Sequence, residues 1–437
     1  MRRQIFMTSE NSVEKYDCAI LNFWCYSNYG AVMTGYALQK ALEEMGYSNR
    51  LVLYMNKAVR RHNEDYFKES HFKKFSDKYI KSTELYTDSS LPELNKATNT
   101  FIVGSDQVWR TNLQGVNKWA YYLNFADAKA KKIACAASFG LNEFLGSLDD
   151  EVMARSWLKH FDAVSVREHE AQTLCSDRWG IDSSVVVDPV FYIDRSHYDA
   201  MADTAAPEAP KEYILAYFLG KSDDDAKVIN EYSRKTGLPV VELKVNETTT
   251  EEWLYYIKHA KLILTNSFHG VCFSVIFNRE FVCVAERDKA YPRFTTVLGK
   301  LGLMERARPS SEFERCADIE KMPIDYAAVA EKLEKERKYA LDWLKRAMDA
   351  PKEPTMSETD DLLRVLSNRM AVIQRAHRDE MTLVHDVLNY GKIKRRYRKC
   401  CLHVIFSRGK KHEEYKLRKK ELKNRLRGIR SFIKHYK

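Results

Sequence analysis

Short apolar runs rich in β-branched residues alternate with amphipathic segments along the first half of the chain. Such runs are typical of buried strands, and they cover residues 18–24, 101–103, 132–136, 163–166 and 185–187. Between the first two runs, Leu38, Leu42 and Met45 share one helical face, and Gly46 follows where that helix should end. The alternation of strands and helices predicts a doubly wound, mostly parallel sheet.

A second α/β pattern follows the stretch 203–210, which has two prolines and no periodicity and is typical of an interdomain linker. Strands are predicted there over 213–218, 239–243, 262–265 and 281–285, and helices over 251–260, 271–277, 298–303 and 339–348. We therefore expect four parts: an N-terminal extension (1–14), a first α/β domain (15–205), a second α/β domain (211–349) and a helical tail (350–437).

The composition places the chain among globular proteins of the cytoplasm. Its 437 residues suit two or three folding units, and 45% of them are hydrophobic. No apolar run reaches the ~18–20 residues that a membrane span needs, and the first residues lack the apolar stretch of a signal peptide. The nine cysteines are odd in number and include no Cys-x-x-Cys pair, so neither a disulfide framework nor a zinc site is indicated.

Positive charge is concentrated at the end of the chain. Residues 392–437 hold 19 Lys or Arg against three Glu. Because the net charge of the whole chain is only +10, the residues before this segment are mildly acidic. Leu422, Leu426, Ile429, Ile433 and Tyr436 form an apolar stripe within that segment. The pattern favours an interfacial helix on an anionic membrane surface. A solvated or self-associating helix is the alternative, and no nucleic-acid motif is present.

Small and polar residues collect directly after the predicted strands, at residues 27–30, 104–109, 138–140, 167–168, 188–189 and 265–270. In parallel sheets the carboxyl ends of the strands share one edge, and ligands bind there. The set as a whole therefore predicts an active site between the strand ends.

His269 is the leading candidate in this set, because it lies between a buried strand and an apolar helix. Gly270 beside it permits close backbone approach, and a helix N-terminus favours anions. A histidine in this place can transfer protons near neutral pH or bind a phosphate. The alternative is a histidine that only packs or caps locally.

Four charged residues have two interpretations each. Arg167 could bind an anion or pair with a neighbouring carboxylate, and Arg293 could bind an anion or be solvated in the first turn of a helix. Asp106 could act in catalysis or cap the following turn. Asp188 precedes a proline, which favours a structural turn.

Several common chemistries lack their motifs. The chain has no Gly-x-x-x-x-Gly-Lys and no Gly-x-Gly-x-x-Gly phosphate loop. It also has no His-Glu-x-x-His zinc motif and no Gly-x-Ser-x-Gly nucleophile elbow. Nothing in the sequence requires a metal or a nicotinamide cofactor.

Taken in order, these segments resemble the polysaccharide pyruvyl transferases over residues 15–349. The matching segments are Asn-Tyr-Gly at 28–30 with Ala-Leu-Gln at 37–39, Val-Gly-Ser-Asp-Gln-Val-Trp at 103–109, Ala-Ser-Phe-Gly at 137–140, Val-Ser-Val-Arg-Glu at 164–168, Val-Asp-Pro-Val-Phe at 187–191, Asn-Ser-Phe-His-Gly at 266–270 with Phe-Ser at 273–274, and Arg293 with Leu-Gly-Leu at 301–303.

The resemblance implies a fold like the GT-B glycosyltransferases, with two Rossmann-like domains facing a cleft. It also implies transfer of pyruvate from phosphoenolpyruvate to two hydroxyls of a sugar, giving a cyclic ketal in surface polysaccharide biosynthesis. We expect a lipid-linked acceptor at the inner face of the cell membrane, and no cofactor or metal.

The resemblance also assigns roles to the candidates. His269 is the match for an acid/base group, and Arg167 and Asp106 join it as catalytic candidates. The donor-binding candidates are Asn266, Ser267, Gly270, Arg287 and Arg293. The acceptor-binding candidates, in the first domain, are Asn28, Tyr29, Gly30, Ser105 and Ser138.

Two positions depart from the family pattern. Some members have an arginine two positions before the histidine, where Ser267 stands here, and relatives of this branch often have asparagine where Arg110 follows Trp109. The donor charge must then be met by Arg167, Arg293 or Arg287. A glycosyltransferase of the same fold that uses a nucleotide sugar is an alternative, and a non-catalytic scaffold of polysaccharide assembly is another.

Overall fold

The computed structural model describes residues 14–23, 28–55, 70–110, 115–245, 247–285, 291–309 and 322–352, with parts of the tail between 394 and 426. The chain divides into two compact units, residues 1–355 and 356–437. In the second unit, residues 394–399 are helical, and of the predicted apolar stripe only Leu422 and Leu426 are described, both buried. Among the described helices, none is long and apolar enough to cross a membrane.

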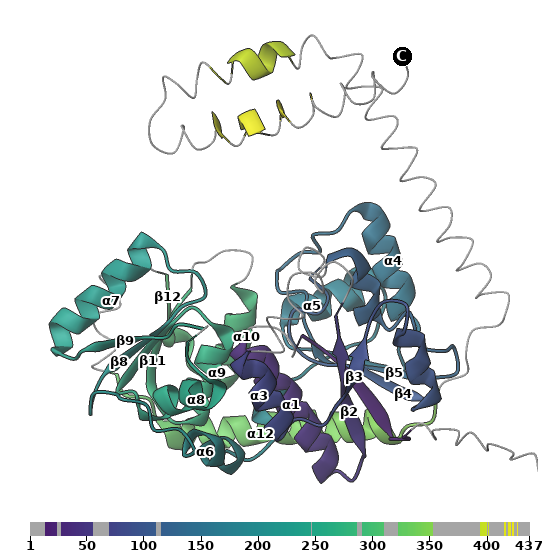
Figure 1. Ribbon diagram of the computed structural model, residues 1–437, viewed down its shortest axis with the longest axis horizontal. Coiled ribbons are helices and arrows are strands. Elements are labelled where there is room, and N and C mark those ends of the chain that lie inside the picture. Colours follow the sequence, from purple (N-terminus) through teal and green to yellow (C-terminus); the bar gives the residue numbers. More distant parts are fainter. Residues whose placement is uncertain are drawn as a thin grey trace, which may run out of the picture. The chain divides into compact units, whose positions relative to one another are not determined.

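The first unit contains two α/β lobes, which Figure 1 shows on either side of α10. The N-lobe has a parallel sheet of seven described strands in the order β3-β2-β1-β4-β5-β6-β7. These strands are β1 (Cys18–Leu21), β2 (Asn49–Tyr54), β3 (Ser82–Tyr86), β4 (Thr100–Val103), β5 (Lys131–Ala137), β6 (Ala163–Val166) and β7 (Ser184–Val185). The order reverses between β1 and β4, and such a reversal opens a ligand crevice at the carboxyl ends of the two strands.

The N-lobe helices cover both faces of this sheet and include several short turns. They are α1 (Tyr29–Glu44), α3 (His71–Tyr79), η1 (Leu91–Lys96), η2 (Gly115–Tyr122), α4 (Leu148–Leu158), α5 (His169–Thr173), η3 (Leu174–Arg178) and η4 (Pro189–Phe191). Helix α6 (Ser196–Ala202) follows in the chain but lies beside the C-lobe in Figure 1. The predicted helix with Leu38 and Leu42 is confirmed as α1, which ends at Glu44, two residues before Gly46 and its positive φ.

The C-lobe has a parallel sheet of five described strands in the order β12-β11-β10-β8-β9. Its strands are β8 (Ile214–Tyr217), β9 (Val240–Glu242), β10 (Leu262–Thr265), β11 (Glu280–Val284) and β12 (Ala307–Arg308). Its helices are α7 (Asp223–Thr236), α8 (Thr250–His259), α9 (Phe268–Ile276), α10 (Pro292–Leu301), η5 (Met304–Arg306) and α12 (Tyr326–Asp349). Here the order reverses between β8 and β10, so the loop that carries His269 lies at a switch point too. The expected pair of Rossmann-like lobes is confirmed.

The two lobes share one apolar core where they meet. Every residue of α9 is buried, and α1 is buried over most of its length. One continuous cluster joins residues of α1 with residues of α8 and α9. Tyr198 of α6, before the predicted linker, packs edge-on against Phe273 of α9. Close packing of this kind leaves little room for movement, so side chains on α1 and α9 hold fixed relative positions.

The long helix α12 runs back from the C-lobe to the N-lobe, along the lower edge of both in Figure 1. At its end, Lys131 Nζ on β5 donates to the carbonyl of Met348 over 2.6 Å, and Lys352 pairs with Asp162 at 2.8 Å. Only residues 339–348 of this helix were predicted, because alternating Lys and Glu obscure the apolar stripe in its first half. The helix connects the two lobes a second time.

Candidate active site

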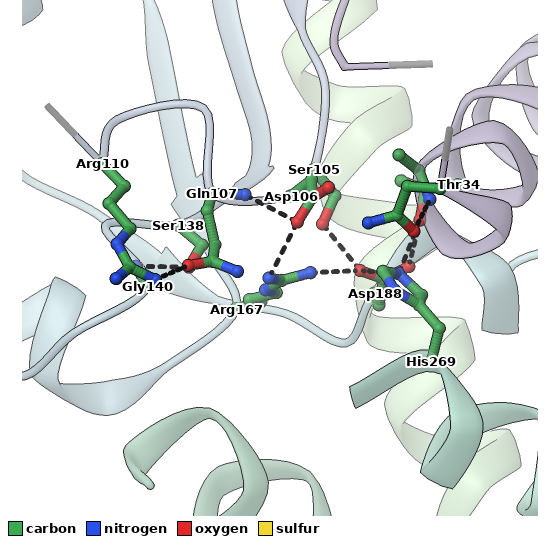
Figure 2. Close-up of polar contacts among 12 residues, drawn as sticks. Thr34, Ser105, Asp106, Gln107, Arg110, Ser138, Gly140, Arg167, Asp188 and His269 are labelled. Atoms are coloured by element: carbon green, nitrogen blue, oxygen red, sulfur yellow. Dashed lines mark hydrogen bonds and ion pairs between the residues drawn. The ribbon is translucent and has the colours of Figure 1, made fainter. Parts of the chain in front are cut away.

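The candidate site lies where the carboxyl ends of the N-lobe strands meet the start of α9 (Figure 2). Ser267 begins α9 as its N-cap, with Oγ accepting from Gly270 N at 3.3 Å, and His269 lies in the first turn. The His269 ring packs directly on Gly30 at the start of α1, where any β-carbon would overlap Nδ1. The two helix starts, one from each lobe, therefore meet at this histidine.

Thr34 and Asp188 hold one side of the His269 ring. Nε2 lies 3.0 Å from Thr34 Oγ1 and 3.7 Å from Asp188 Oδ2. Thr34 Oγ1 donates to Asp188 Oδ1 at 3.1 Å, so its single proton is used there. The imidazole must then donate its Nε2–H to the threonine oxygen. This leaves Nδ1 as the nitrogen that can gain and lose a proton, and no described residue hydrogen-bonds it.

Asp188 lies between Arg167 and His269 in Figure 2. Its Oδ2 accepts from Ser105 Oγ at 2.7 Å and from Arg167 Nη1 at 3.0 Å. Burial alone would raise the pKa of Asp188, but hydrogen bonding to His269 and the charges of His269 and Arg167 hold it well below its usual range. The carboxylate is therefore ionised at neutral pH. It also caps the turn at Val190, as the sequence indicated.

Arg167, at the end of β6, lies among three carboxylates. Besides Asp188 it pairs with Asp106 at 3.3 Å and with Glu168 at 3.7 Å, and its guanidinium stacks 4.4 Å from the centre of the Phe268 ring. Burial acts to lower the pKa of Arg167, and the three carboxylates outweigh it and raise the pKa. Of the two interpretations left open by the sequence, the ion pair with neighbouring carboxylates is the one seen in these contacts.

Asp106, three residues beyond the end of β4, adopts a strained backbone conformation with φ of +89°. Its Oδ1 accepts from Gln107 N at 2.8 Å as well as from Arg167. Trp109, fully buried three residues later, donates its Nε1–H to the carbonyl of Tyr121. A non-glycine residue at positive φ costs about 1–3 kcal/mol and persists where surrounding contacts over-determine it, often at functional sites.

Glu168 is a buried carboxyl that sequence reasoning did not select as functional. Its Oε1 accepts from Ser138 Oγ at 2.7 Å and from Phe139 N at 3.1 Å. Oε2 has no hydrogen-bond partner among the described residues. Burial raises the pKa of Glu168, and the charge of Arg167 only partly offsets this. The residue could have been found from its place after Arg167 at a strand end.

Arg293 differs from Arg167 in having no ionic partner among the described residues. It is half-buried in the first turn of α10, and its Nε is buried without a hydrogen-bond partner. Burial, and next the charge of Arg167, lower the pKa of Arg293 to about 10, so the side chain stays charged at neutral pH. An anion bound beside Arg293 would meet this cation without displacing an ion pair of the described residues.

The remaining acceptor-side candidates have structural contacts. Asn28 is the N-cap of α1 and accepts from Ala31 N at 3.2 Å. Tyr29 is fully buried, stacks on Trp253 and donates to the carbonyl of Thr248 at 2.7 Å, which ties the start of α1 to the C-lobe.

The remaining donor-side candidates lie at the C-lobe strand ends. Asn266 Oδ1 accepts from Leu219 N at 2.7 Å, which joins the loop after β8 to the loop after β10. Gly270 lies against Thr265, where a β-carbon would overlap the threonine hydroxyl. Arg287 lies outside the described residues. In the part of the chain that the structure describes, no group of three His, Cys, Asp or Glu is placed to hold a metal.

Among solved structures, the chain is similar to UDP-GlcNAc 2-epimerase from Neisseria meningitidis, with a TM-score of 0.47 and 11% identity over 75% of this chain and 99% of the other. It is also similar to the ADP-heptose LPS heptosyltransferase II of E. coli, with a TM-score of 0.32 and 11% identity over 74% and 99%. No curated protein matches the sequence. The model of the polysaccharide pyruvyl transferases matches residues 28–288, more than half of the chain and all the motifs around the site except Arg293. On this match, the chain belongs to the polysaccharide pyruvyl transferase family.

Proposed function

We propose that this protein transfers pyruvate from phosphoenolpyruvate to two hydroxyls of one sugar, forming a cyclic ketal and releasing inorganic phosphate. The observation that carries the proposal is a buried histidine held by an ionised aspartate, with an arginine nearby that lacks an ionic partner among the described residues. The reaction needs both: a proton donor for the enol carbon and a cation for the donor's phosphate and carboxylate. Membership of the family supports the same chemistry.

In the proposed reaction, His269 delivers a proton from Nδ1 to the methylene carbon of phosphoenolpyruvate. The neighbouring carbon becomes an oxocarbenium centre, and one sugar hydroxyl attacks it and gives up its proton. The carbon–oxygen bond to phosphate then breaks, and the second hydroxyl attacks the same carbon and closes the ring. The sugar loses two protons: one restores the proton that His269 gave to the donor carbon, and the other leaves with the phosphate as hydrogen phosphate. His269 therefore acts first as an acid and then as a base.

Asp188 acts on this reaction through His269. Its carboxylate lies 3.7 Å from Nε2 and shares Thr34 with it, so it fixes the ring orientation and stabilises the imidazolium. Ser105 and Arg167 in turn hold the carboxylate. Asp188 is therefore a positioning residue in the proposal, and Asp106 holds the other terminal nitrogen of Arg167, Nη2.

The proposal divides the two substrates between the lobes. Arg293, Ser267, Asn266, Gly270 and Arg287 belong to the donor side, as the resemblance implies. Asn28, Tyr29, Gly30, Ser105 and Ser138 shape the acceptor side: Gly30 by allowing the His269 ring to lie at the start of α1, and the hydroxyls by fixing Asp188 and Glu168.

We further propose that the acceptor is lipid-linked and that residues 392–437 bring the enzyme to an anionic membrane at its cytoplasmic face. The charge excess and apolar stripe of that segment support this. Flotation with anionic liposomes measures it directly: removal of residues 392–437 should abolish flotation and leave transfer to a soluble acceptor intact. Unchanged flotation would overturn the proposal.

Mass spectrometry of lipid-linked oligosaccharides tests the transfer itself. After incubation with phosphoenolpyruvate, the acceptor should gain the mass of pyruvic acid less one water, and His269→Ala should remove this gain. His259→Ala, at an exposed position of α8, is the matched control. A gain with nucleotide sugars and none with phosphoenolpyruvate would establish the glycosyltransferase alternative instead.

A further inference from the structure

A buried asparagine lies at the end of β1, where the order of the N-lobe strands reverses. Asn22 directly follows β1, and only 2% of its surface is exposed. Neither its Nδ2 nor its Oδ1 has a hydrogen-bond partner among the described residues. A buried amide without partners costs free energy, and such groups are rare in native proteins. The place of Asn22 in the fold therefore calls for a partner from outside the chain.

The side chain of Asn22 points to the face of the sheet that α1 covers. Side chains alternate between the two faces of a strand, and Cys18 and Ile20 of β1 belong to the apolar cluster that contains α1. Asn22 continues this alternation. A β-carbon added at Gly104 would lie 3.5 Å from Asn22 Nδ2 and 3.4 Å from Leu38 Cδ2. The amide therefore lies between α1 and the segment that follows β4.

Both neighbours of this amide lead to the residues that hold the catalytic histidine. Gly104 immediately precedes Ser105. Leu38 lies one helical turn after Thr34, on the same face of α1. Ser105 and Thr34 both donate to Asp188, as Figure 2 shows. Their hydroxyl protons are committed to that carboxylate, whereas the neighbouring amide has no hydrogen bond that a ligand would have to break.

A second buried asparagine of the N-lobe shows the contacts of an amide with a structural role. Asn49, the first residue of β2, is 1% exposed. Its Oδ1 accepts from Gln39 Nε2 at 3.0 Å, and its Nδ2 donates to the carbonyls of Gln39 and Tyr47, both at 3.2 Å. Asn49 lies at the amino end of the sheet, whereas ligands bind at the carboxyl end. The two asparagines are buried alike, and the one without partners is the one at the ligand-binding end.

An amide selects a ligand that can both accept and donate hydrogen bonds. Its nitrogen carries two donors and its oxygen is an acceptor. Neighbouring hydroxyls of a sugar match this pair, because one hydroxyl can accept from the nitrogen while the next donates to the oxygen. A phosphate or a carboxylate matches it less well, since an anion has no proton to offer to the amide oxygen. The chemistry of the side chain therefore favours the sugar over the anionic donor.

We propose that Asn22 binds the acceptor sugar, with Nδ2 donating to one hydroxyl and Oδ1 accepting from its neighbour. The proposal deepens the proposed function and rests on it for the identity of the acceptor. It places the sugar at the carboxyl ends of β1 and β4, beside the hydroxyls that link Asp188 with His269 and the rest of the network. Because the amide has no hydrogen bond among the described residues, it can turn towards the sugar without losing one.

The proposal predicts opposite effects of one substitution on stability and on binding. Asn22→Leu replaces an unsatisfied buried amide by an apolar group of similar size, so the urea midpoint of unfolding should rise. Its affinity for the acceptor should fall about tenfold, because two hydrogen bonds to the ligand are lost. Its affinity for phosphoenolpyruvate should not change. Asn49→Leu, the matched control, breaks satisfied hydrogen bonds, so its unfolding midpoint should fall.

Calorimetric titration of the full-length protein provides the test. The acceptor probe is the oligosaccharide that mild acid releases from the lipid-linked precursors, titrated without phosphoenolpyruvate. A second titration uses phosphoenolpyruvate alone, and urea unfolding is measured on the same preparations. Asn22→Ala also lacks both bonding atoms and replaces Asn22→Leu if that variant does not fold. Asn22→Ser keeps one donor and one acceptor, so its affinity for the oligosaccharide should fall between those of the wild type and Asn22→Leu.

Weaker oligosaccharide binding in Asn22→Leu, with unchanged phosphoenolpyruvate binding and a raised unfolding midpoint, supports the proposal. Wild-type affinity for the oligosaccharide in this variant, equal losses of affinity for both ligands, or a wild type that does not bind the oligosaccharide would overturn it. A fall in the midpoint as large as that of Asn49→Leu would also overturn it, because the amide would then have a structural role. Oligosaccharide binding that depends on Asn22, without ketal formation from phosphoenolpyruvate, would leave this assignment standing and refute the proposed function.

Discussion

Each lobe places an arginine at the site, but only the N-lobe arginine pairs with carboxylates of the described residues. On the N-lobe, Arg167 is buried among three carboxylates and stacked on an aromatic ring, so its charge is compensated before any ligand arrives. On the C-lobe, Arg293 is half-buried with no hydrogen-bonded acid among the described residues. Arg167 therefore has its ionic partners within the protein, whereas Arg293 has none among the described residues. We infer that Arg167 stabilises the site and that Arg293 is available to bind an anionic substrate.

The comparison predicts the largest loss of stability for the compensated arginine. Arg167→Gln leaves three buried carboxylates without their cation, so the free energy of unfolding should fall by about 3–5 kcal/mol. Urea unfolding followed by tryptophan fluorescence measures this, with Arg234→Gln as the exposed control. A loss no larger than that of the control would mean that Arg167 is not the structural cation.

Asp188→Asn should lower the free energy of unfolding by somewhat less, about 2–3 kcal/mol at pH 7, and this loss should depend on pH. The pKa of Asp188 is lowered in the folded protein, so its contribution is present above the usual carboxyl pKa and is lost as pH falls towards the folded value. The gap between the wild type and Asp188→Asn should therefore be widest near neutral pH and shrink below about pH 4. A gap that grows in acid would contradict the ionised carboxylate; Asp224→Asn, at an exposed position, is the control.

Arg293→Gln should behave in the opposite way to Arg167→Gln. Its removal breaks no ion pair among the described residues, so unfolding free energy should change by no more than about 0.5 kcal/mol. Donor affinity should nevertheless fall about tenfold, which corresponds to about 1.4 kcal/mol. Paired measurements of unfolding and of phosphoenolpyruvate binding on the same preparation test this, and a destabilisation equal to that of Arg167→Gln would remove the distinction between the two arginines.

Thr34→Val should lower the free energy of unfolding less than Arg167→Gln or Asp188→Asn. It removes the hydroxyl that accepts from His269 and donates to Asp188, a loss of about 1 kcal/mol in unfolding free energy. Thr34→Ser retains the hydroxyl and should restore both stability and activity. If Thr34→Ser is as impaired as Thr34→Val, the methyl group rather than the hydrogen bonds carries the role of Thr34.

The sequence predicted the central strands and the position of His269 because both leave strong local patterns. The apolar run at 262–265 matches β10 residue for residue, and the run at 163–166 matches β6. The outer strands β2 and β3 were not predicted. Their sequences, Asn-Arg-Leu-Val-Leu-Tyr and Ser-Thr-Glu-Leu-Tyr, mix polar and apolar residues because β2 is next to the edge and β3 lies at it.

Contacts between residues far apart in the chain could not be predicted from the sequence. Asp188 was interpreted as a turn residue, which it is, but its links to Ser105, Arg167 and Thr34 join residues 21 to 154 positions apart. Thr34 gave no signal of its own, since a threonine within a buried helix is usually only packed. The pairing of Arg167 and the isolation of Arg293 likewise depend on how the lobes meet.

Isotope incorporation tests the central claim that His269 protonates the donor carbon. Transfer from phosphoenolpyruvate in deuterated water should give a ketal whose methyl group carries one deuterium, and His269→Asn should form no ketal above background under the same conditions. A product without deuterium, or equal product from His269→Asn, would contradict the account.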